Sequence, residues 1–143
     1  MDAQRRTLKT GPLTLEIKVD AEGRLCSVTL PKKVPTDLDA ATLSQTLTEL
    51  GKFSLAPEGA AFTQKVWAHM AKIPWGSALT YGELAAKAGS PKATRAVGNA
   101  CATNPLPLIV PCHRVLANEG LGGFAYGPEW KMKLLELESE PRP

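Results

Sequence analysis

The fold of this chain is decided by residues 80–103, which read TYGELAAKAGSPKATRAVGNACAT. Thr80 and Glu83 have the spacing of a capping box, in which the threonine accepts a first-turn amide hydrogen and the glutamate reaches back, so a helix begins here. The Gly-Ser-Pro turn at 89–91 ends that helix and starts a second one, which we expect to continue to about Thr103. Two short helices joined by a tight glycine-containing turn predict a helix-turn-helix, with an ordinary helical hairpin as the alternative.

The positive charge of the chain is concentrated around these two helices. The formal net charge is +3. Residues 62–104 contain five lysine or arginine residues and one acid, Glu83, whereas in residues 1–60 eight basic residues balance eight acidic ones. A local positive field favours a polyanionic partner such as a nucleic acid, and a solvated helix face explains the charge equally well.

Downstream, an apolar run at 106–110 leads into the pentapeptide Pro-Cys-His-Arg-Val at 111–115. The end of the run, Leu-Ile-Val, predicts a short buried strand or extended segment. A cysteine that follows such a segment is held rigidly at the floor of a pocket. Residues 118–123 contain three glycines and predict a loop, and Pro128 suits the first turn of a last helix.

Cys112 beside His113 is a candidate activated nucleophile. A free cysteine has a pKa of about 8.5, so only a minor fraction is thiolate at neutral pH, and an imidazole that accepts the proton lowers this cost. The imidazole in turn needs a carboxylate partner, for which Glu119, Glu136 and Glu138 are the downstream candidates. The alternative interpretation is a buried structural cysteine beside a surface histidine.

The first part of the chain predicts a β-hairpin. Four apolar residues alternate with polar ones over 13–19, which is the period of a half-buried strand, and a Glu-Gly turn at 22–23 leads to a second strand over 25–30. Cys26 lies on that second strand, where we interpret it as a small buried hydrophobe.

A helix and a boundary follow the hairpin. Thr36 or Asp37 is expected to cap a helix that extends to Leu50. Residues 51–60 are rich in Gly, Pro, Ala and Ser and mark a boundary between two parts of the chain. Beyond it, apolar residues spaced by three or four over 62–72 predict an amphipathic helix.

These elements predict an α/β chain of two parts. Residues 1–60 form a small N-terminal α/β lobe, made of a hairpin plus a helix. Residues 61–143 form a mostly helical C-terminal domain that contains the helix-turn-helix and Cys112.

Composition excludes several classes of protein. Three scattered cysteines, Cys26, Cys101 and Cys112, argue against a disulfide framework, and with only His69 and His113 as imidazoles no metal site is predicted. No apolar run approaches the roughly 18 residues that span a bilayer. The polar N-terminus lacks the apolar segment of a secretory signal, so we predict a cytoplasmic protein without a membrane association.

The pentapeptide at 111–115, preceded by Asn-Pro at 104–105 and followed by a glycine-rich loop, resembles the signature of the O6-alkylguanine-DNA alkyltransferases. Further segments resemble motifs of that family, in family order, over about the last eighty residues: FTQKVW at 62–67, Ile-Pro at 73–74, Gly76, TYGELA at 80–85 and RAVG at 95–98.

This resemblance implies a single-use repair reaction. The protein would bind duplex DNA through the minor groove and flip the damaged base into a pocket. The Cys112 thiolate would then attack the alkyl carbon on O6 of guanine, with O4 of thymine as a further target, in one in-line displacement. The product is a stable S-alkylcysteine, so each molecule acts once, without a cofactor and as a monomer.

The resemblance also assigns catalytic roles. His113 would take the thiol proton through a water, and Glu138 would polarise the histidine. Asn104 would tie the helix pair to the active-site segment. Tyr81 would lie near the base and its 3′ phosphate, where its phenol helps the guanine leave.

The remaining roles concern DNA and the pocket. Arg95 would fill the gap left by the flipped base, with backbone groups of Cys112, Val115 and Ala125 reading base edges. The other DNA contacts implied are Thr80, Tyr81, Ala93, Thr94, Ala96 and Asn118. The implied pocket residues are Cys101, Pro107, Val115, Phe124, Ala125 and Tyr126.

The chain departs from the family pattern within the pocket. Ala125 stands where serine is frequent, which leaves a backbone amide as the donor to O6. Phe124 replaces a common tyrosine. Tyr126 stands where many members have glycine, and we expect its bulk to narrow the pocket and disfavour large O6 substituents. The zinc ligands of some members are absent.

Two other functions remain open on the sequence. A non-catalytic lesion-binding protein, like the alkyltransferase-like proteins, would carry tryptophan at the nucleophile position, which Cys112 argues against. A thiol hydrolase would use Cys112 and His113 with an oxyanion hole, and would not need Arg95 or a basic helix pair.

Overall fold

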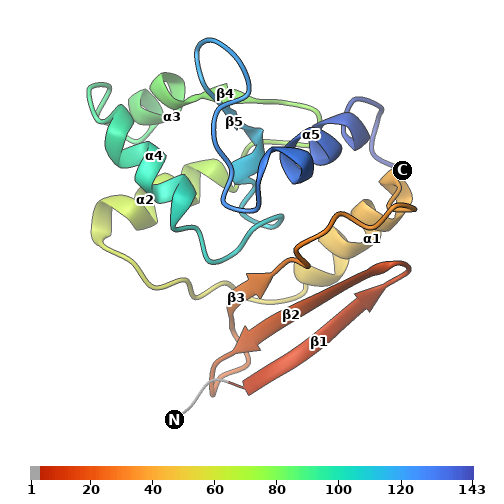
Figure 1. Cartoon of the computed structure of the whole chain (residues 1–143). Helices are drawn as coiled ribbons and strands as arrows, with labels where there is room; N and C mark the ends of the chain where they lie inside the picture. Colours follow the sequence, from red (N-terminus) through yellow and green to blue (C-terminus); the bar gives the residue numbers. More distant parts are fainter. Residues whose placement is uncertain (1–3) are drawn as a thin grey trace.

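The computed structural model describes residues 4–143, so the first three residues of the predicted N-terminal lobe lie outside the described part. The chain is α/β: an antiparallel three-stranded sheet of order β1-β2-β3 lies at one end, and most of the helices lie above it (Figure 1). The elements are β1 (Gln4–Thr10), β2 (Leu13–Val19), β3 (Leu25–Thr29), α1 (Ala40–Leu50), α2 (Ala61–Met70), β4 (Leu79–Thr80), α3 (Tyr81–Lys87), α4 (Thr94–Ala102), the 3-10 turn η1 (Cys112–Arg114), β5 (Val115–Leu116) and α5 (Pro128–Leu137).

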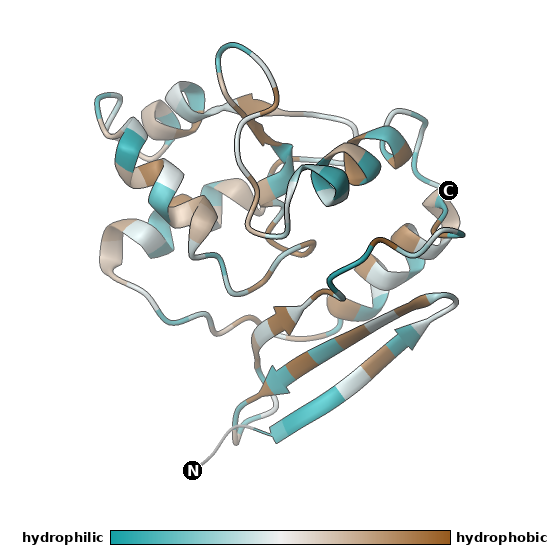
Figure 2. Cartoon of the chain, in the orientation of Figure 1, coloured by the Kyte–Doolittle hydropathy of each residue, from teal (hydrophilic) through white to brown (hydrophobic). Residues whose placement is uncertain are grey.

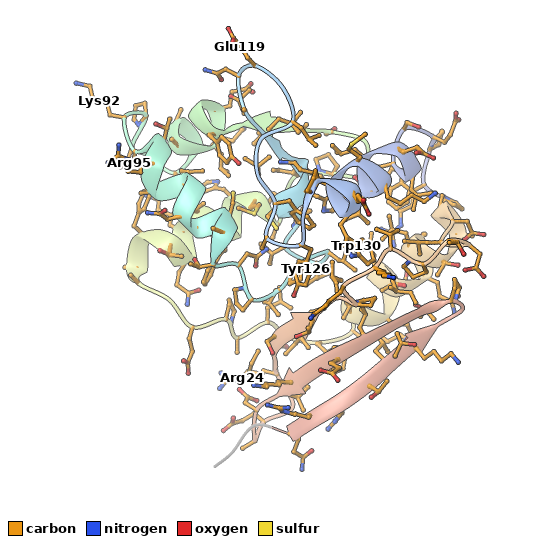
Figure 3. The ribbon with its side chains drawn as sticks, viewed as in Figure 1. Arg24, Lys92, Arg95, Glu119, Tyr126 and Trp130 are labelled. Atoms are coloured by element: carbon orange, nitrogen blue, oxygen red, sulfur yellow. The ribbon has the colours of Figure 1, made fainter. Side chains whose placement is uncertain are left out.

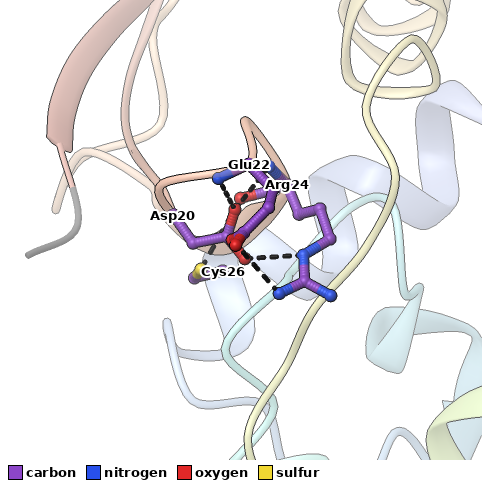
Figure 4. Close-up of polar contacts among 4 residues, drawn as sticks. All are labelled: Asp20, Glu22, Arg24 and Cys26. Atoms are coloured by element: carbon purple, nitrogen blue, oxygen red, sulfur yellow. Dashed lines mark hydrogen bonds and ion pairs between the residues drawn. The ribbon is translucent and has the colours of Figure 1, made fainter. Parts of the chain in front are cut away.

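The predicted hairpin is present as β2 and β3. The alternation along β2 appears as alternate apolar and polar bands in Figure 2, and its apolar side chains are buried while the residues between them are exposed. The β2–β3 turn is closed by Asp20, whose carboxylate accepts the backbone N–H groups of Glu22 and Arg24 at 3.0 and 2.8 Å (Figure 4). Cys26, just beyond, is half-buried, and its thiol lies 3.6 Å from the Arg24 carbonyl oxygen.

Strand β1 was not predicted from the sequence. It pairs with β2 along its whole length, Gln4 opposite Val19 and Thr10 opposite Leu13. It is an edge strand whose first four residues are exposed, so it lacks the apolar alternation that reveals a strand with one buried face.

Helix α1 packs its apolar face, including Leu43, Leu47 and Leu50, into the core beside the sheet (Figure 1). The prediction of its cap was wrong: the helix begins after Asp39, whose carboxylate accepts the Thr42 N–H, rather than after Thr36 or Asp37. Asp39 was not among the predicted caps, because the choice among neighbouring capping residues depends on local backbone geometry that the sequence pattern does not specify.

The helices α2, α3 and α4 pack on one another. The Trp67 indole donates to the Ala100 carbonyl oxygen at 2.8 Å and so joins α2 to α4. The capping box of α3 is present, with Thr80 and Glu83 as its two members. Helix α4 begins at Thr94, later than predicted, because residues 91–93 remain in the turn.

The apolar run before Cys112 is not a strand. Residues 105–110 form consecutive turns, with Leu108 at a positive φ of 75°. The side chain of Asn104 holds them, since it accepts the Leu106 N–H at 2.9 Å and donates to the Val110 carbonyl at 2.7 Å. The predicted strand or extended segment at 108–110 was therefore wrong, because this backbone is folded into turns in which the Val110 N–H donates to the Leu106 carbonyl at 2.9 Å.

Within residues 4–143 no helix is both long enough and apolar enough to cross a membrane.

Replacing Asp39 by alanine is expected to lower the melting temperature by about 3–5 °C, because it removes the only side-chain acceptor at the start of α1. Asp37→Ala is the matched control, since Asp37 is exposed outside the helix. Thermal unfolding followed by circular dichroism measures both. Equal shifts in the two variants would contradict the assignment of the cap.

Candidate active site

A cavity of about 200 Å³ lies in the helical part of the chain, with Cys112 in its wall. Its lining comes from four places: the start of α3, helix α4, the turn η1, and residues 117–127, called the pocket loop below. The lining residues are Tyr81, Gly98, Cys101, Ala102, Cys112, Gly123, Phe124 and Ala125. A cavity of similar size beside Lys72 and Lys87 offers no nucleophilic thiol, so we assign the chemistry to the cavity that contains Cys112.

Local structure brings these walls together. Strands β4 and β5 pair in parallel, Leu79 with Val115 and Thr80 with Leu116, which sets Tyr81 beside the segment that follows Cys112. Gly122 of the pocket loop has φ +75°, and a Cβ on it would come within 3.1 Å of the Tyr81 hydroxyl and 3.0 Å of a backbone nitrogen. Glycine is therefore required for the loop to approach this closely.

Cys112 and His113 lie on a single 3-10 turn, η1, and both are buried. In a strand they would point to opposite faces, so this turn is what allows the two side chains to serve one site. The Cys112 N–H donates to the Val110 carbonyl at 2.8 Å and fixes the residue at the end of the turns held by Asn104.

His113, Arg114 and Glu138 form a buried ion cluster. His113 Nε2 lies 2.8 Å from Glu138 Oε2, and the Arg114 guanidinium donates to both carboxylate oxygens at 2.7 Å. A third guanidinium bond reaches the Ile73 carbonyl at 2.7 Å. Of the three candidate carboxylates, the structure pairs His113 with Glu138, whereas Glu119 and Glu136 are exposed.

The cluster fixes the protonation states of its members. Burial alone raises the pKa of Glu138, but hydrogen bonds from His113 and Arg114 outweigh it and lower the pKa to about 2. Burial lowers the pKa of His113 and outweighs the hydrogen bond and negative charge of Glu138, which raise it. A neutral imidazole facing a carboxylate carries its proton on Nε2, which leaves Nδ1 as an acceptor. Nδ1 is indeed the one buried side-chain nitrogen or oxygen without a hydrogen-bond partner among residues 4–143.

The cavity wall contains two buried thiols, Cys101 and Cys112. Burial raises the pKa of Cys101 to about 12. Burial also raises the pKa of Cys112, but the Asn104 side chain and the charge of Lys131 oppose that shift. Cys112 differs from Cys101 in lying directly beside His113, the base of the buried ion cluster.

Arg114 and Lys131 were both missed as functional residues by the sequence analysis. Lys131 is fully buried on α5, where Nζ donates to the Val115 carbonyl at 2.7 Å and the Gly123 carbonyl at 2.9 Å. Its one sequence signal is its place beside Trp130 and three residues before Leu134, on the buried face of the helix. A lysine at such a position is rarely accommodated without specific partners.

Some predicted pocket residues lie elsewhere. Pro107 is buried in the turns before Cys112, and the Val115 side chain is in the core, so neither lines the cavity. Tyr126 does not line it either, because its hydroxyl points to the Val28 carbonyl at 3.5 Å. The expected narrowing of the pocket by Tyr126 thus stays a prediction, since Tyr126 contacts the wall residue Phe124 rather than the cavity. Cys101, Phe124 and Ala125 do line the cavity, as predicted.

Three of the seven predicted DNA-contacting residues lie in the first turn of α4. Arg95 projects away from the core near Lys92 (Figure 3), and the neighbouring Thr94 and Ala96 are exposed. Three residues after Arg95, Gly98 already belongs to the cavity wall, so one helix carries both features. Ala93 and Thr80 are half-buried, and Asn118 is exposed in the pocket loop.

The residues that surround the cavity offer no metal site. No group of three or more His, Cys, Asp or Glu side chains is placed to hold a metal ion anywhere in the described residues.

A family model described as 6-O-methylguanine DNA methyltransferase, DNA binding domain, matches residues 61–140. The chain belongs to the 6-O-methylguanine DNA methyltransferase family. The match covers α2 to α5 and therefore every residue of the cavity and of the buried ion cluster.

Curated relatives agree with this assignment. The chain is 53% identical over 85 residues to the methylated-DNA–protein-cysteine methyltransferase of Methanosarcina acetivorans, covering 59% of this chain and 54% of the relative. It is 49% identical over 88 residues to the protein of that name in Haemophilus influenzae, covering 61% of this chain and 49% of the relative. The chain thus spans about half the length of these curated relatives.

The similarity in structure extends further along the chain. The crystal structure of Mycobacterium tuberculosis OGT in complex with DNA matches with a TM-score of 0.74 at 32% identity, covering 94% of this chain and 92% of that one. Because it covers 94% of this chain, the match extends beyond residues 61–140 into the N-terminal part.

Glu138 makes the stability of the fold sensitive to acid. Its folded pKa of about 2 lies below its ordinary value of 4.5, so the unfolded chain takes up this proton first as the pH falls. The stabilisation is complete above pH 4.5 and is lost as the pH falls from 4.5 to 2. We expect Glu138→Gln to flatten the pH dependence of the urea midpoint in this window. The variant Glu136→Gln, at an exposed position on the same helix, should retain the wild-type slope; an unchanged slope in Glu138→Gln would contradict the assignment.

Proposed function

We propose that this chain repairs DNA by direct reversal, moving the alkyl group from O6 of guanine to the sulfur of Cys112 in a single, irreversible turnover. The observation that carries the proposal is the arrangement around the thiol: Cys112 lies in a cavity wall, next to a buried histidine whose Nε2 is held by Glu138 and whose Nδ1 is free to accept a proton. The family assignment supports the same reaction.

The proposed reaction begins with ionisation of the thiol. The proton on Cys112 Sγ passes to His113 Nδ1 through a water, while the ionised Glu138 stabilises the resulting imidazolium. The positive charge of Lys131 favours the thiolate in a site where burial otherwise opposes it. Arg114 acts as a positioning residue, because its bonds to both carboxylate oxygens fix the direction in which Glu138 meets the imidazole.

The alkyl group then moves in one displacement. A bond forms between Sγ and the alkyl carbon as the bond between that carbon and O6 breaks, and the electron pair of the broken bond goes to the guanine. Burial raises the pKa of Tyr81, so its hydroxyl is protonated and able to donate to the departing base. In sum the sulfur exchanges a proton for an alkyl group, and the guanine is restored.

The outer face of α4 is the proposed DNA surface. We assign α3 and α4 as a helix-turn-helix within a C-terminal domain of residues 61–143, with the N-terminal lobe at 1–60. Helix α4 would face the minor groove, and Arg95 would occupy the space of the flipped base. A bound DNA in the structure of the M. tuberculosis relative supports DNA as the partner. The need for a reduced thiol fits action in the cytoplasm.

The non-catalytic lesion-binding alternative is less well supported, because Cys112 and its histidine–glutamate pair would have no use in a protein that only binds. The hydrolase alternative would need turnover, whereas alkylation of Cys112 consumes the nucleophile.

Incubation with duplex DNA that carries a labelled methyl group on guanine O6 tests the proposal. We expect about one methyl per protein, on the peptide that contains Cys112, because the alkylated thiol has no route back. Cys101→Ser, which alters the other thiol of the cavity, should still accept the methyl group, and Cys112→Ser should not. Absence of transfer, or several turnovers per molecule, would contradict the proposal.

Arg95→Ala is expected to slow repair of duplex DNA by about tenfold or more, since an unstacked base costs a few kcal/mol that the arginine would offset. Reaction with a free O6-substituted guanine, which needs no flipping, should change less than about twofold. Lys133→Ala is a control for loss of a positive charge away from α4. Equal losses on both substrates would argue against the assigned role of Arg95.

A further inference from the structure

The N-terminal sheet makes polar contact with the helical part of the chain through a short stretch, residues 28–31. Val28 is on β3, the edge strand of the sheet, opposite Ile17 of β2. Its N–H donates to the Pro105 carbonyl at 2.8 Å, and its carbonyl accepts the Tyr126 hydroxyl at 3.5 Å. In a strand the N–H and C=O of one residue point to the same side, so both polar groups of Val28 face the helical part.

A third hydrogen bond joins residues 28–31 to the helical part of the chain. The indole of Trp130, the third residue of α5, donates to the Pro31 carbonyl at 2.9 Å. Trp130 is buried and Tyr126 is half-buried, and Figure 3 shows both on the side of the helical part that looks toward β3. The three partners of the stretch, Pro105, Tyr126 and Trp130, all flank segments that build the cavity.

Tyr126 directly follows the cavity wall. The pocket loop contributes Gly123, Phe124 and Ala125 to the lining, and two further bonds hold this part of it: Lys131 Nζ to the Gly123 carbonyl, and the Gly127 N–H to the Phe124 carbonyl at 2.9 Å. Both belong to the loop and the helix behind it. The Tyr126 hydroxyl is the bond that ties this end of the loop to a different part of the fold.

We propose that Tyr126 is a positioning residue that fastens the cavity wall at Phe124 and Ala125 to the N-terminal sheet through the Val28 carbonyl. The ring also packs against Phe124, with centroids 5.9 Å apart, so movement of Tyr126 moves the wall. Phe124 in turn meets the edge of the His113 ring at 6.4 Å between centroids. The N-terminal lobe thereby acts on the site by setting where the loop backbone presents its amides.

This inference rests on the proposed alkyl transfer and predicts a specific kinetic change. Tyr126→Phe keeps the ring and removes only the hydroxyl. We expect the rate of alkylation at saturating O6-methylguanine duplex to fall by about three- to tenfold, the usual effect of one lost hydrogen bond. The pH profile of Cys112 reaction with iodoacetamide should remain that of the wild type, because this reaction does not depend on the loop amides.

Hydrogen exchange provides the second measurement. Amides of residues 123–127 should exchange faster in Tyr126→Phe, with the melting temperature unchanged within about 2 °C. Ser27→Ala is the control: it removes a hydroxyl from the neighbouring position of β3 that makes no contact with the loop among the described hydrogen bonds, and we expect wild-type values.

The outcomes separate the two proposals. A slower rate of alkylation at saturating duplex together with faster amide exchange in Tyr126→Phe supports the proposal that Tyr126 positions the cavity wall. Wild-type rate and exchange in that variant would overturn it, as would an equal slowing of the iodoacetamide reaction. If the wild-type protein transferred no methyl group, the proposed function would fail, and the exchange data alone would still decide whether the hydroxyl fastens the loop.

Discussion

The site depends on the buried pairing of Glu138 with His113 and Arg114. His113 and Arg114 lie on η1 and Glu138 lies at the end of α5, and the third Arg114 bond, to the Ile73 carbonyl, adds the segment after α2. Ions removed from water are stabilised only when the geometry is good and their remaining hydrogen-bonding groups are satisfied. Here both carboxylate oxygens and three guanidinium nitrogens have partners, so one carboxylate joins η1, α5 and the α2–β4 connection.

That pairing also explains an unfavourable position. Glu138 is the C-cap of α5, where a carboxylate is opposed by the helix dipole. Arg114 and His113 offset that repulsion through their hydrogen bonds to the carboxylate. The position of Glu138 at the helix end also fixes where the carboxylate lies. The imidazole is thus held by Nε2 alone, with Nδ1 left for the proton of Cys112. Cys101, the other thiol of the cavity, has no comparable base, and burial raises its pKa to about 12.

Local patterns predicted the elements that are governed by local interactions. The capping box at Thr80 and the alternation in β2 are contacts between residues close in sequence, and both were found where expected. The same holds for Pro128 at the start of α5. The family resemblance predicted Glu138 as the partner of His113, a contact across 25 positions that periodicity does not reveal.

The features that the sequence did not reveal are set by tertiary contacts. Strand β1 is held by pairing with β2 and lacks a buried face of its own, while the turns at 105–110 are held by the single side chain of Asn104. Lys131 and Arg114 appear in the sequence as ordinary charged residues, because what distinguishes them is complete or nearly complete burial. Tyr126 was assigned to the pocket by its sequence position, but its direction is set by the carbonyl of Val28, about a hundred residues away.

Transfer of the thiol proton requires His113 to be a neutral base with an open Nδ1. Nitrogen-15 NMR of the imidazole side chains in the unalkylated protein at pH 7 tests it directly, with His69→Gln used to assign the two histidines. We expect His113 to show a protonated Nε2 and an unprotonated Nδ1, and to remain neutral to a lower pH than an ordinary imidazole, because burial lowers its pKa. An imidazolium, or a neutral ring with the proton on Nδ1, would contradict it, since neither could take the proton from Cys112.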